Sequence, residues 1–144
     1  VRTNFIVRDS SVFFGRQNKP HRDRVRREFL DNIRGADYQL ALRGSANYSY
    51  RPWEAMCVGR RPLFVDTDCA WPFDDEVDWS KLLVRVDESD LPRLPEALLD
   101  AHAALDDESF REIQHACRAT WERYLTPLGL ARWLRDFLAQ RVAR

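Results

Sequence analysis

The hydrophobic residues of this chain form two patterns, and the one that recurs about every four positions indicates helices. From Arg22 to Ile33 the apolar residues Val25, Phe29 and Ile33 lie four positions apart, which predicts a helix with one apolar face. Gly35 follows directly and is a residue type at which helices commonly end. The N-terminal quarter is therefore expected to be dominated by one amphipathic helix.

Further helices are predicted from similar stripes. Arg51–Val58 is expected to be a short helix, with Pro52 in its first turn and Gly59 at its end. Three longer stripes follow in the C-terminal half of the chain, each with helical spacing. They consist of Leu94, Leu98, Ala101 and Leu105; of Phe110, Ile113, Cys117, Trp121 and Tyr124; and of Leu130, Trp133, Leu134 and Phe137.

Polar residues predict where these later helices begin. Ser89 or Asp90 can cap the first of them, and Asp106 or Asp107 can cap the second, because their side chains can accept hydrogen bonds from free backbone N–H groups. Thr126-Pro127 separates the second helix from the last one.

Short, nearly continuous apolar runs indicate buried strands. Tyr38 to Leu42 is apolar apart from Gln39, as expected of a strand that is covered on both faces in a parallel sheet. Phe5-Ile6-Val7 is either another strand or an entering segment. The remaining predicted strands are Val12–Phe14, which Gly15 closes, Pro62–Val65 and Leu82–Val86.

Alternating strands and helices predict an α/β fold, a Rossmann-like parallel sheet flanked by helices. The 144 residues are enough for about one domain, so residues 1–144 are expected to form a single domain. Within it, residues 1–10 are either a linker or an entering strand, and residues 128–144 form the C-terminal helix.

Composition narrows the function classes. The chain is 44% hydrophobic and 32% charged, and its 23 basic and 23 acidic residues cancel, so nucleic acid is not an expected partner. Cys57, Cys69 and Cys117 lack metal-ligand spacing, and their odd number does not suggest a disulfide framework. No apolar run approaches the roughly 20 residues that span a bilayer, so no transmembrane segment is expected in this chain.

The candidate chemistry lies between the second and third predicted strands. Gly44, Ser45 and Ser49 belong to a loop of small residues whose backbone N–H groups could approach a phosphate at the start of the following helix. Arg43 and Arg51 could each place a guanidinium fork on phosphate oxygens. The spacing therefore favours a diphosphate site.

Glu54 follows Arg51 by one helical turn, and its carboxylate could accept hydrogen bonds from the two hydroxyls of a ribose. The same spacing equally suits an exposed Arg51–Glu54 ion pair, worth only a few tenths of a kcal/mol. The pattern matches neither the dinucleotide-binding fingerprint nor a P-loop, so spacing alone leaves both interpretations open.

A family resemblance supports the functional interpretation. The run RGSANYSYRPWEAMCVGRRPLFV, which begins at Arg43, is followed by Trp71-Pro72-Phe73 and Val77-Asp78-Trp79. Together these elements closely resemble the exostosin-like (GT47-type) glycosyltransferases over residues 12–137. Arg60-Arg61 departs from the family, where many relatives carry a cysteine or other small residue and an isoleucine before the proline.

The resemblance implies the C-terminal, donor-binding half of a GT-B fold, in which a separate N-terminal domain supplies most acceptor contacts. It further implies inverting transfer from a nucleotide-diphospho sugar, with neither a cofactor nor an essential metal. Carried over by position, Ser49 and Arg51 are expected at the diphosphate and Glu54 at the ribose. Arg43 and Arg16, the latter after the first predicted strand, are further candidate phosphate ligands.

Residues after the strand Pro62–Val65 are candidates for the sugar or the acceptor, because ligands bind at the carboxyl ends of parallel strands. They are Asp66, Thr67 and Asp68, for which a capped turn is an equal alternative, and Trp71, in a predicted loop. The acidic run 74–76 is expected to be a solvated loop and not a metal site, because consecutive carboxylates point apart. His21, His102 and His115 are not placed to serve as catalytic base, which stays unassigned.

The sequence thus predicts a glycosyltransferase domain whose partners are a nucleotide-sugar donor, a glycan acceptor and a missing N-terminal domain. One alternative is a non-catalytic nucleotide-binding or accessory module that retains the fold, and another is a flavodoxin-like regulatory domain. A bacterial protein of this kind is expected in the cytoplasm or at the periphery of the inner membrane, and a eukaryotic one in the Golgi lumen.

Overall fold

A computed structural model describes residues 2–8, 18–44 and 46–142 of the chain. It divides into two compact units, Val1–Asp37 and Tyr38–Arg144. The predicted strand Val12–Phe14 with its closing Gly15, and two candidate site residues, Arg16 and Ser45, lie outside the described residues.

The first unit contains helix α2, Lys19–Arg34. The helix begins earlier than predicted because the Asn18 side chain accepts a hydrogen bond from His21 N–H at 3.0 Å, and Pro20 fits in the first turn. It ends at Gly35, as predicted, and Ile33 on its apolar face is 1% exposed.

Residues 2–8 contain no strand, so the entering strand considered for Phe5–Val7 is absent there. Phe5 and Val7 are 69% and 92% exposed, which is incompatible with a strand buried in a sheet. Hydrogen bonds tie the segment to α2 within the first unit, one of them from the Asn32 side chain to Asn4 O at 2.9 Å.

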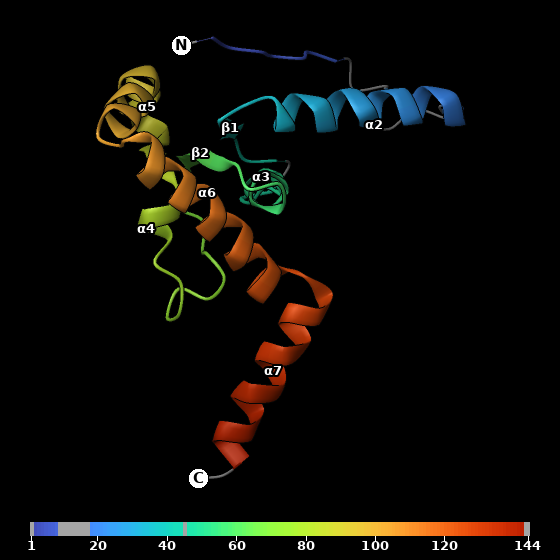
Figure 1. Cartoon of the computed structure of the whole chain (residues 1–144), viewed down its shortest axis with the longest axis vertical. Coiled ribbons are helices and arrows are strands. Elements are labelled where there is room, and N and C mark those ends of the chain that lie inside the picture. Colours follow the sequence, from blue (N-terminus) through green and yellow to red (C-terminus); the bar gives the residue numbers. More distant parts are fainter. Residues whose placement is uncertain (1, 9–17, 45, 143–144) are drawn as a thin grey trace. The chain divides into compact units, whose positions relative to one another are not determined.

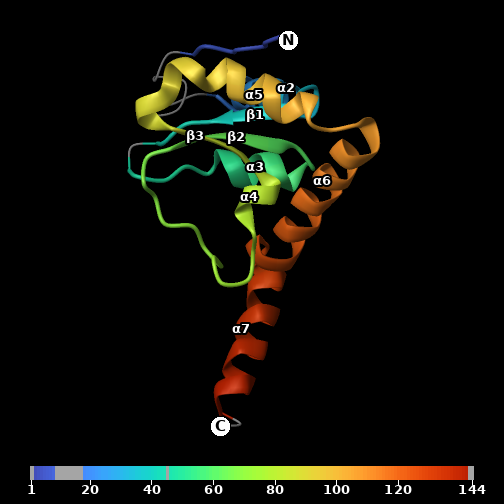
Figure 2. The same cartoon turned by 90° about the vertical axis from the view of Figure 1, so that its left-hand side faces the viewer.

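The second unit is built around a parallel sheet of three strands in the order β1–β2–β3 (Figure 2). The strands are β1 (Tyr38–Ala41), β2 (Arg61–Asp66) and β3 (Val84–Asp87). The central strand β2 is buried along five of its six residues, because helices cover both of its faces. The predicted α/β architecture with a Rossmann-like parallel sheet is thereby confirmed.

Each face of the sheet has its own apolar cluster. On one face Leu63, Val84 and Val86 pack against Leu94 and Leu98 of α5 (Leu94–Ala103). The opposite face carries the larger cluster, which includes side chains from three helices: α3 (Arg51–Cys57), α4 (Trp79–Leu82) and α6 (Asp107–Thr120). Figure 2 shows α5 on one side of the strands and α3 with α4 on the other.

The last helices form an arm that is interrupted at Thr126, whose backbone is extended, as Thr126-Pro127 predicted. Helix α6 passes into a π-helical turn, η2 (Trp121–Leu125), and then into α7 (Pro127–Val142), which extends away from the sheet (Figure 1). The predicted stripe on α6 is confirmed, since Cys117 and Tyr124 are 0% and 7% exposed. No helix in the described part of the chain combines the length and apolar character needed to cross a membrane.

Two predictions around β3 were wrong. The predicted strand began at Leu82, but this residue belongs to α4, and β3 begins at Val84. The next helical segment, η1 (Glu88–Arg93), is capped by neither Ser89 nor Asp90. Instead, Asp87 accepts hydrogen bonds from the N–H and the hydroxyl of Ser89, because its own backbone is extended, as at a helix cap.

Arg61, where the sequence departs from the exostosin-like pattern, is buried at the start of β2 with 8% of its surface exposed. Its Nη2 donates to Leu83 O at 3.4 Å, whereas its Nε and Nη1 have no hydrogen-bond partner among the described residues. Burial raises the pKa of the Cys117 thiol to about 12, against the opposing effect of the Arg61 charge. This corner of the core therefore holds a charge that is incompletely compensated.

Arg61→Met is expected to raise the free energy of unfolding by about 1–3 kcal/mol, because methionine fills similar space without buried, unsatisfied donors. Urea denaturation of native and variant chains measures the change. Arg111→Met, at an exposed position on α6, is the matched control and should change stability by less than about 0.5 kcal/mol. A clear loss of stability in Arg61→Met would show that the guanidinium is compensated after all.

Candidate functional site

The described candidate residues lie in two loops that leave the same edge of the sheet and in the helix that follows the first loop. The first loop follows β1 and leads into α3, and the second follows β2 at Asp66 and leads to α4. Because β1 and β2 are parallel, with Ala41 opposite Phe64, both loops begin at carboxyl ends of strands. Parallel α/β sheets bind ligands at this edge.

The first loop folds back on itself. Gly44 N–H donates to Tyr48 O at 2.9 Å, and Tyr48 N–H donates to Ala46 O at 2.8 Å. A Cβ atom at Gly44 would lie 3.2 Å from Tyr48 O, so the tight approach favours glycine. The Gly44 N–H is thus committed within the loop, and phosphate binding would need other donors there.

Ser49 supports the start of α3. Its Oγ accepts a hydrogen bond from Arg51 N–H at 3.2 Å, which leaves the hydroxyl proton for donation to another group. Helix α3 has seven residues, so its dipole is a weaker source of positive potential than that of a long helix. The cationic side chains of Arg43 and Arg51 therefore dominate the chemistry available to an anion.

Arg51 and Glu54 form the ion pair that was the alternative interpretation of their spacing. Arg51 Nη1 lies 3.3 Å from Glu54 Oε2, and the two side chains are 38% and 42% exposed. Partial burial raises the pKa of Glu54, and the Arg51 charge opposes that shift. Arg43 is exposed and makes no ion pair with any described residue.

Asn47 joins the two loops. Its Nδ2 donates to Asp68 O at 3.3 Å, and its Oδ1 accepts a short hydrogen bond from the Thr67 hydroxyl. The structure thus brings Thr67 and Asp68 next to the loop that carries Gly44 and Ser49. Thr67 and Asp68 were predicted as sugar or acceptor contacts, a role that the structure neither supports nor opposes.

Asp66 closes the second loop with a capped turn. Its Oδ1 accepts from Asp68 N–H at 3.1 Å, and its Oδ2 accepts from Arg85 Nε and Nη2 at 2.8 and 2.5 Å. Asp68 has a positive φ of 57°, which aspartate tolerates better than most residues. The turn and the ion pair together occupy both oxygens of Asp66.

Trp71 lies in the core, with 9% of its surface exposed. Its ring centroid lies 4.7 Å from that of Phe64, 5.1 Å from that of Trp53 and 5.0 Å from that of Trp79. Trp53 and Trp79 belong to the same core cluster. With both sides packed, the ring is not an open platform for stacking a sugar.

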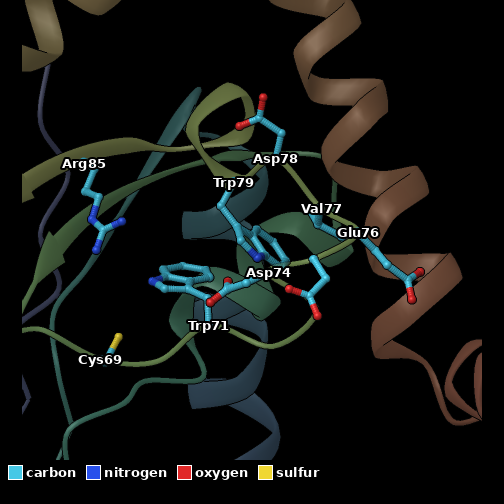
Figure 3. Close-up of a pocket in the computed structure, with 9 residues that line it drawn as sticks. Cys69, Trp71, Asp74, Glu76, Val77, Asp78, Trp79 and Arg85 are labelled. Atoms are coloured by element: carbon cyan, nitrogen blue, oxygen red, sulfur yellow. The ribbon is translucent and has the colours of Figure 1, made fainter.

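A pocket of about 570 Å³ opens beside this cluster (Figure 3). Its wall consists of the acidic stretch 74–78 together with Cys69, Trp71, Trp79 and Arg85. Sequence reasoning missed Cys69 and Arg85 as site residues. The signal for Arg85 was its polar position between two buried valines of β3, which places it on the solvent side of the sheet edge.

The carboxylates of this stretch point in different directions, as Figure 3 shows for Asp74, Glu76 and Asp78. Within the described residues, no group of three His, Cys, Asp or Glu side chains could hold a metal ion. His102 packs against the rings of Tyr38 and Phe110, and its Nδ1 lies 3.1 Å from the Tyr38 hydroxyl oxygen, so its observed role is structural. No catalytic base is identified among the residues that the structure describes.

Comparison with known proteins finds a partial match. Over 70 residues, the chain is 33% identical to a probable glucuronosyltransferase of Oryza sativa subsp. japonica. The match covers 49% of this chain and 16% of the plant protein, so it spans a small part of that relative. It supports a relationship to glycosyltransferases in general. No protein-family profile matches the chain, and no solved structure does.

The balance between burial and ion pairing at Glu54 can be tested directly. Arg51→Gln is expected to raise the pKa of Glu54 further, because the substitution removes the cation that lowers the pKa and leaves the burial that raises it. Carbon-13 NMR of the Glu54 carboxyl during a pH titration measures its pKa in the native chain and in Arg51→Gln. Arg93→Gln, which perturbs an exposed Arg93–Glu96 pair, should leave the Glu54 value unchanged. An unchanged or lowered pKa in Arg51→Gln would contradict this electrostatic account.

Proposed function

We propose that this chain binds the nucleotide-diphospho sugar donor of an inverting, exostosin-like glycosyltransferase with a GT-B fold. The observation that carries the proposal is the placement of Arg43, Arg51 and Glu54 at the carboxyl edge of a parallel sheet. The partial match to a probable glucuronosyltransferase supports the same class of reaction. The acceptor would be a glycan, held mainly by a separate N-terminal domain.

The Arg51–Glu54 ion pair is weak enough to separate when a ligand binds. An exposed pair of this spacing contributes only about 0.2–0.5 kcal/mol, so separating the two groups costs little. A diphosphate would draw the Arg51 guanidinium toward its oxygens, in an interaction stronger than the pair it replaces. Glu54 would then be released to accept hydrogen bonds from the ribose hydroxyls.

The catalytic contribution of this donor-binding chain would be to stabilise the leaving group. As the bond between sugar and diphosphate breaks, negative charge grows on the diphosphate, and fixed cations near it lower the barrier. Arg51 and Arg43 would supply these cations, with Ser49 donating its free hydroxyl proton. Arg16 and Ser45, proposed for the same role from sequence, lie outside the described residues.

A non-catalytic nucleotide-binding module is the second candidate. It is favoured by one observation: Arg43, Arg51 and Glu54 suit the donor side, whereas none of the three histidines of the chain, a common type of general base, lies in the two loops of the site. Transfer activity of a longer protein that includes the acceptor-binding domain would favour the enzyme. Donor binding without transfer in that longer protein would favour the module.

Donor binding is tested by calorimetric titration of UDP-, GDP- and CMP-sugars into native chain, Arg51→Ala and Glu54→Ala. Each substitution is expected to weaken the donor that binds by roughly 10- to 150-fold, because it removes a charged hydrogen-bond partner worth about 1.5–3 kcal/mol.

Arg93→Ala and Glu96→Ala serve as matched controls, since these residues form an exposed pair of the same i,i+3 spacing. They should leave donor affinity unchanged. The proposal would be wrong if no donor bound the native chain, or if both site variants bound a donor as tightly as the native chain does.

A further inference from the structure

The pocket beside Trp71 offers a combination of groups that the proposed diphosphate site does not use. Carboxylates from the acidic stretch 74–78 form one side, and the indole rings of Trp71 and Trp79 contribute an apolar wall. Arg85 contributes a guanidinium at the rim. A volume of about 570 Å³ lies within the range of small-molecule binding sites.

Trp71 carries a hydrogen-bond donor that lacks an acceptor. Its Nε1 is buried and has no partner among the described residues, and the residue as a whole is only 9% exposed. Trp79, in the same wall, donates its Nε1–H to Pro72 O at 3.0 Å. Leaving a buried N–H unpaired is unfavourable, so the Trp71 donor is unusual for a purely structural tryptophan.

The unpaired donor is directed into the pocket. Figure 3 shows the indole nitrogen of Trp71 pointing toward the space between Cys69 and Arg85, both of which line the pocket. The nitrogen has almost no accessible surface of its own, so a ligand atom reaches it once a neighbouring side chain turns aside.

The acidic side retains unused acceptors. Glu76 accepts from Trp133 Nε1 at 2.5 Å, and Asp78 accepts from Ser80 Oγ and pairs with Lys81. Asp74 and Asp75 make no hydrogen bond or ion pair with any described residue. A ligand in this pocket therefore meets free acceptors on one side, and a buried donor without a partner lies just beneath the surface on the other.

We propose that this pocket binds the ring of a neutral sugar. A sugar hydroxyl can donate a proton to a carboxylate and accept one from an indole N–H, whereas a cationic amine can only donate. An anionic sugar such as a uronate would be repelled by the carboxylates of the acidic stretch.

The role of this sugar as part of the donor or the acceptor rests on the proposed function, whereas the binding of a sugar to the pocket does not. Asp68 is hydrogen-bonded to Asn47 of the proposed diphosphate loop, and Cys69 of the pocket follows it directly in the chain. Trp53 packs on Trp71 and lies between Arg51 and Glu54 in α3. The sugar is therefore part of either the donor or the acceptor glycan.

Binding is tested by NMR of the tryptophan indole N–H groups in the nitrogen-15-labelled chain. The neutral probes are the methyl glycosides of glucose, galactose, mannose and xylose, and methyl glucuronoside is the anionic counterpart of the glucose probe. At least one neutral glycoside is expected to shift the Trp71 indole signal, and the glucuronoside should bind about tenfold more weakly than the glucoside.

Two variants report on the two sides of the pocket. Trp71→Phe should weaken the neutral glycoside about tenfold, because it removes the N–H and keeps an aromatic ring. Trp121→Phe, the same substitution outside the pocket, is its control. A double variant with Asp74→Asn and Asp75→Asn changes exposed side chains, so it should fold, and it should bring the affinities for glucoside and glucuronoside close together.

The inference is overturned if no neutral glycoside shifts the Trp71 signal, if Trp71→Phe binds as the native chain does, or if the glucuronoside binds as tightly as the glucoside. A UDP-sugar that shifts Trp71 only while Arg51 is intact would assign the pocket to the donor, and a free glycoside that binds alongside UDP would assign it to the acceptor. Nucleotide binding without any glycoside effect would overturn the inference about the pocket and leave the proposed function intact. Glycoside binding without donor binding would overturn only the proposed function.

Discussion

The aromatic cluster around Trp71 is the contact on which the arrangement of the candidate site depends. Trp71 packs against Phe64 of β2, Trp53 of α3 and Trp79 of α4, so one side chain joins three elements that are separate in sequence. Because Trp53 lies between Arg51 and Glu54, this packing fixes the helix turn that carries both charged groups. Trp71 itself belongs to the loop after β2, so the same packing anchors that loop to the core.

Polar contacts around that cluster are numerous but individually weak, which suits a site that must rearrange. Asn47 bridges the two loops at the edge of the sheet, and the Arg51–Glu54 pair is more than one-third exposed on both sides. Exposed pairs and single neutral hydrogen bonds each contribute about 1 kcal/mol or less. A rigid apolar framework therefore carries charged groups that a nucleotide could redirect at small cost.

Sequence periodicity predicted the elements that depend on local pattern and missed those that depend on distant partners. Helix α2 follows from regular apolar spacing and strand β2 from a continuous apolar run. Gly59 follows the end of α3 with a positive φ of 68°, as its position suggested. The loop position of Trp71 concealed its burial, because its ring partners Phe64 and Trp79 lie in other elements. Arg51 and Glu54 were predicted as site residues from motif and spacing, whereas the pocket and Arg85 are recognised only when β3 is placed beside β2.

Chemical-shift mapping of the backbone amides with the donor nucleotide tests the central claim most directly. The account predicts that the largest changes fall on residues 43–54 and on Thr67 and Asp68, at the carboxyl edge of the sheet. Amides of α5, which covers one face of the sheet, should move little. Changes concentrated on α5 or α7, with the 43–54 segment unaffected, would contradict it.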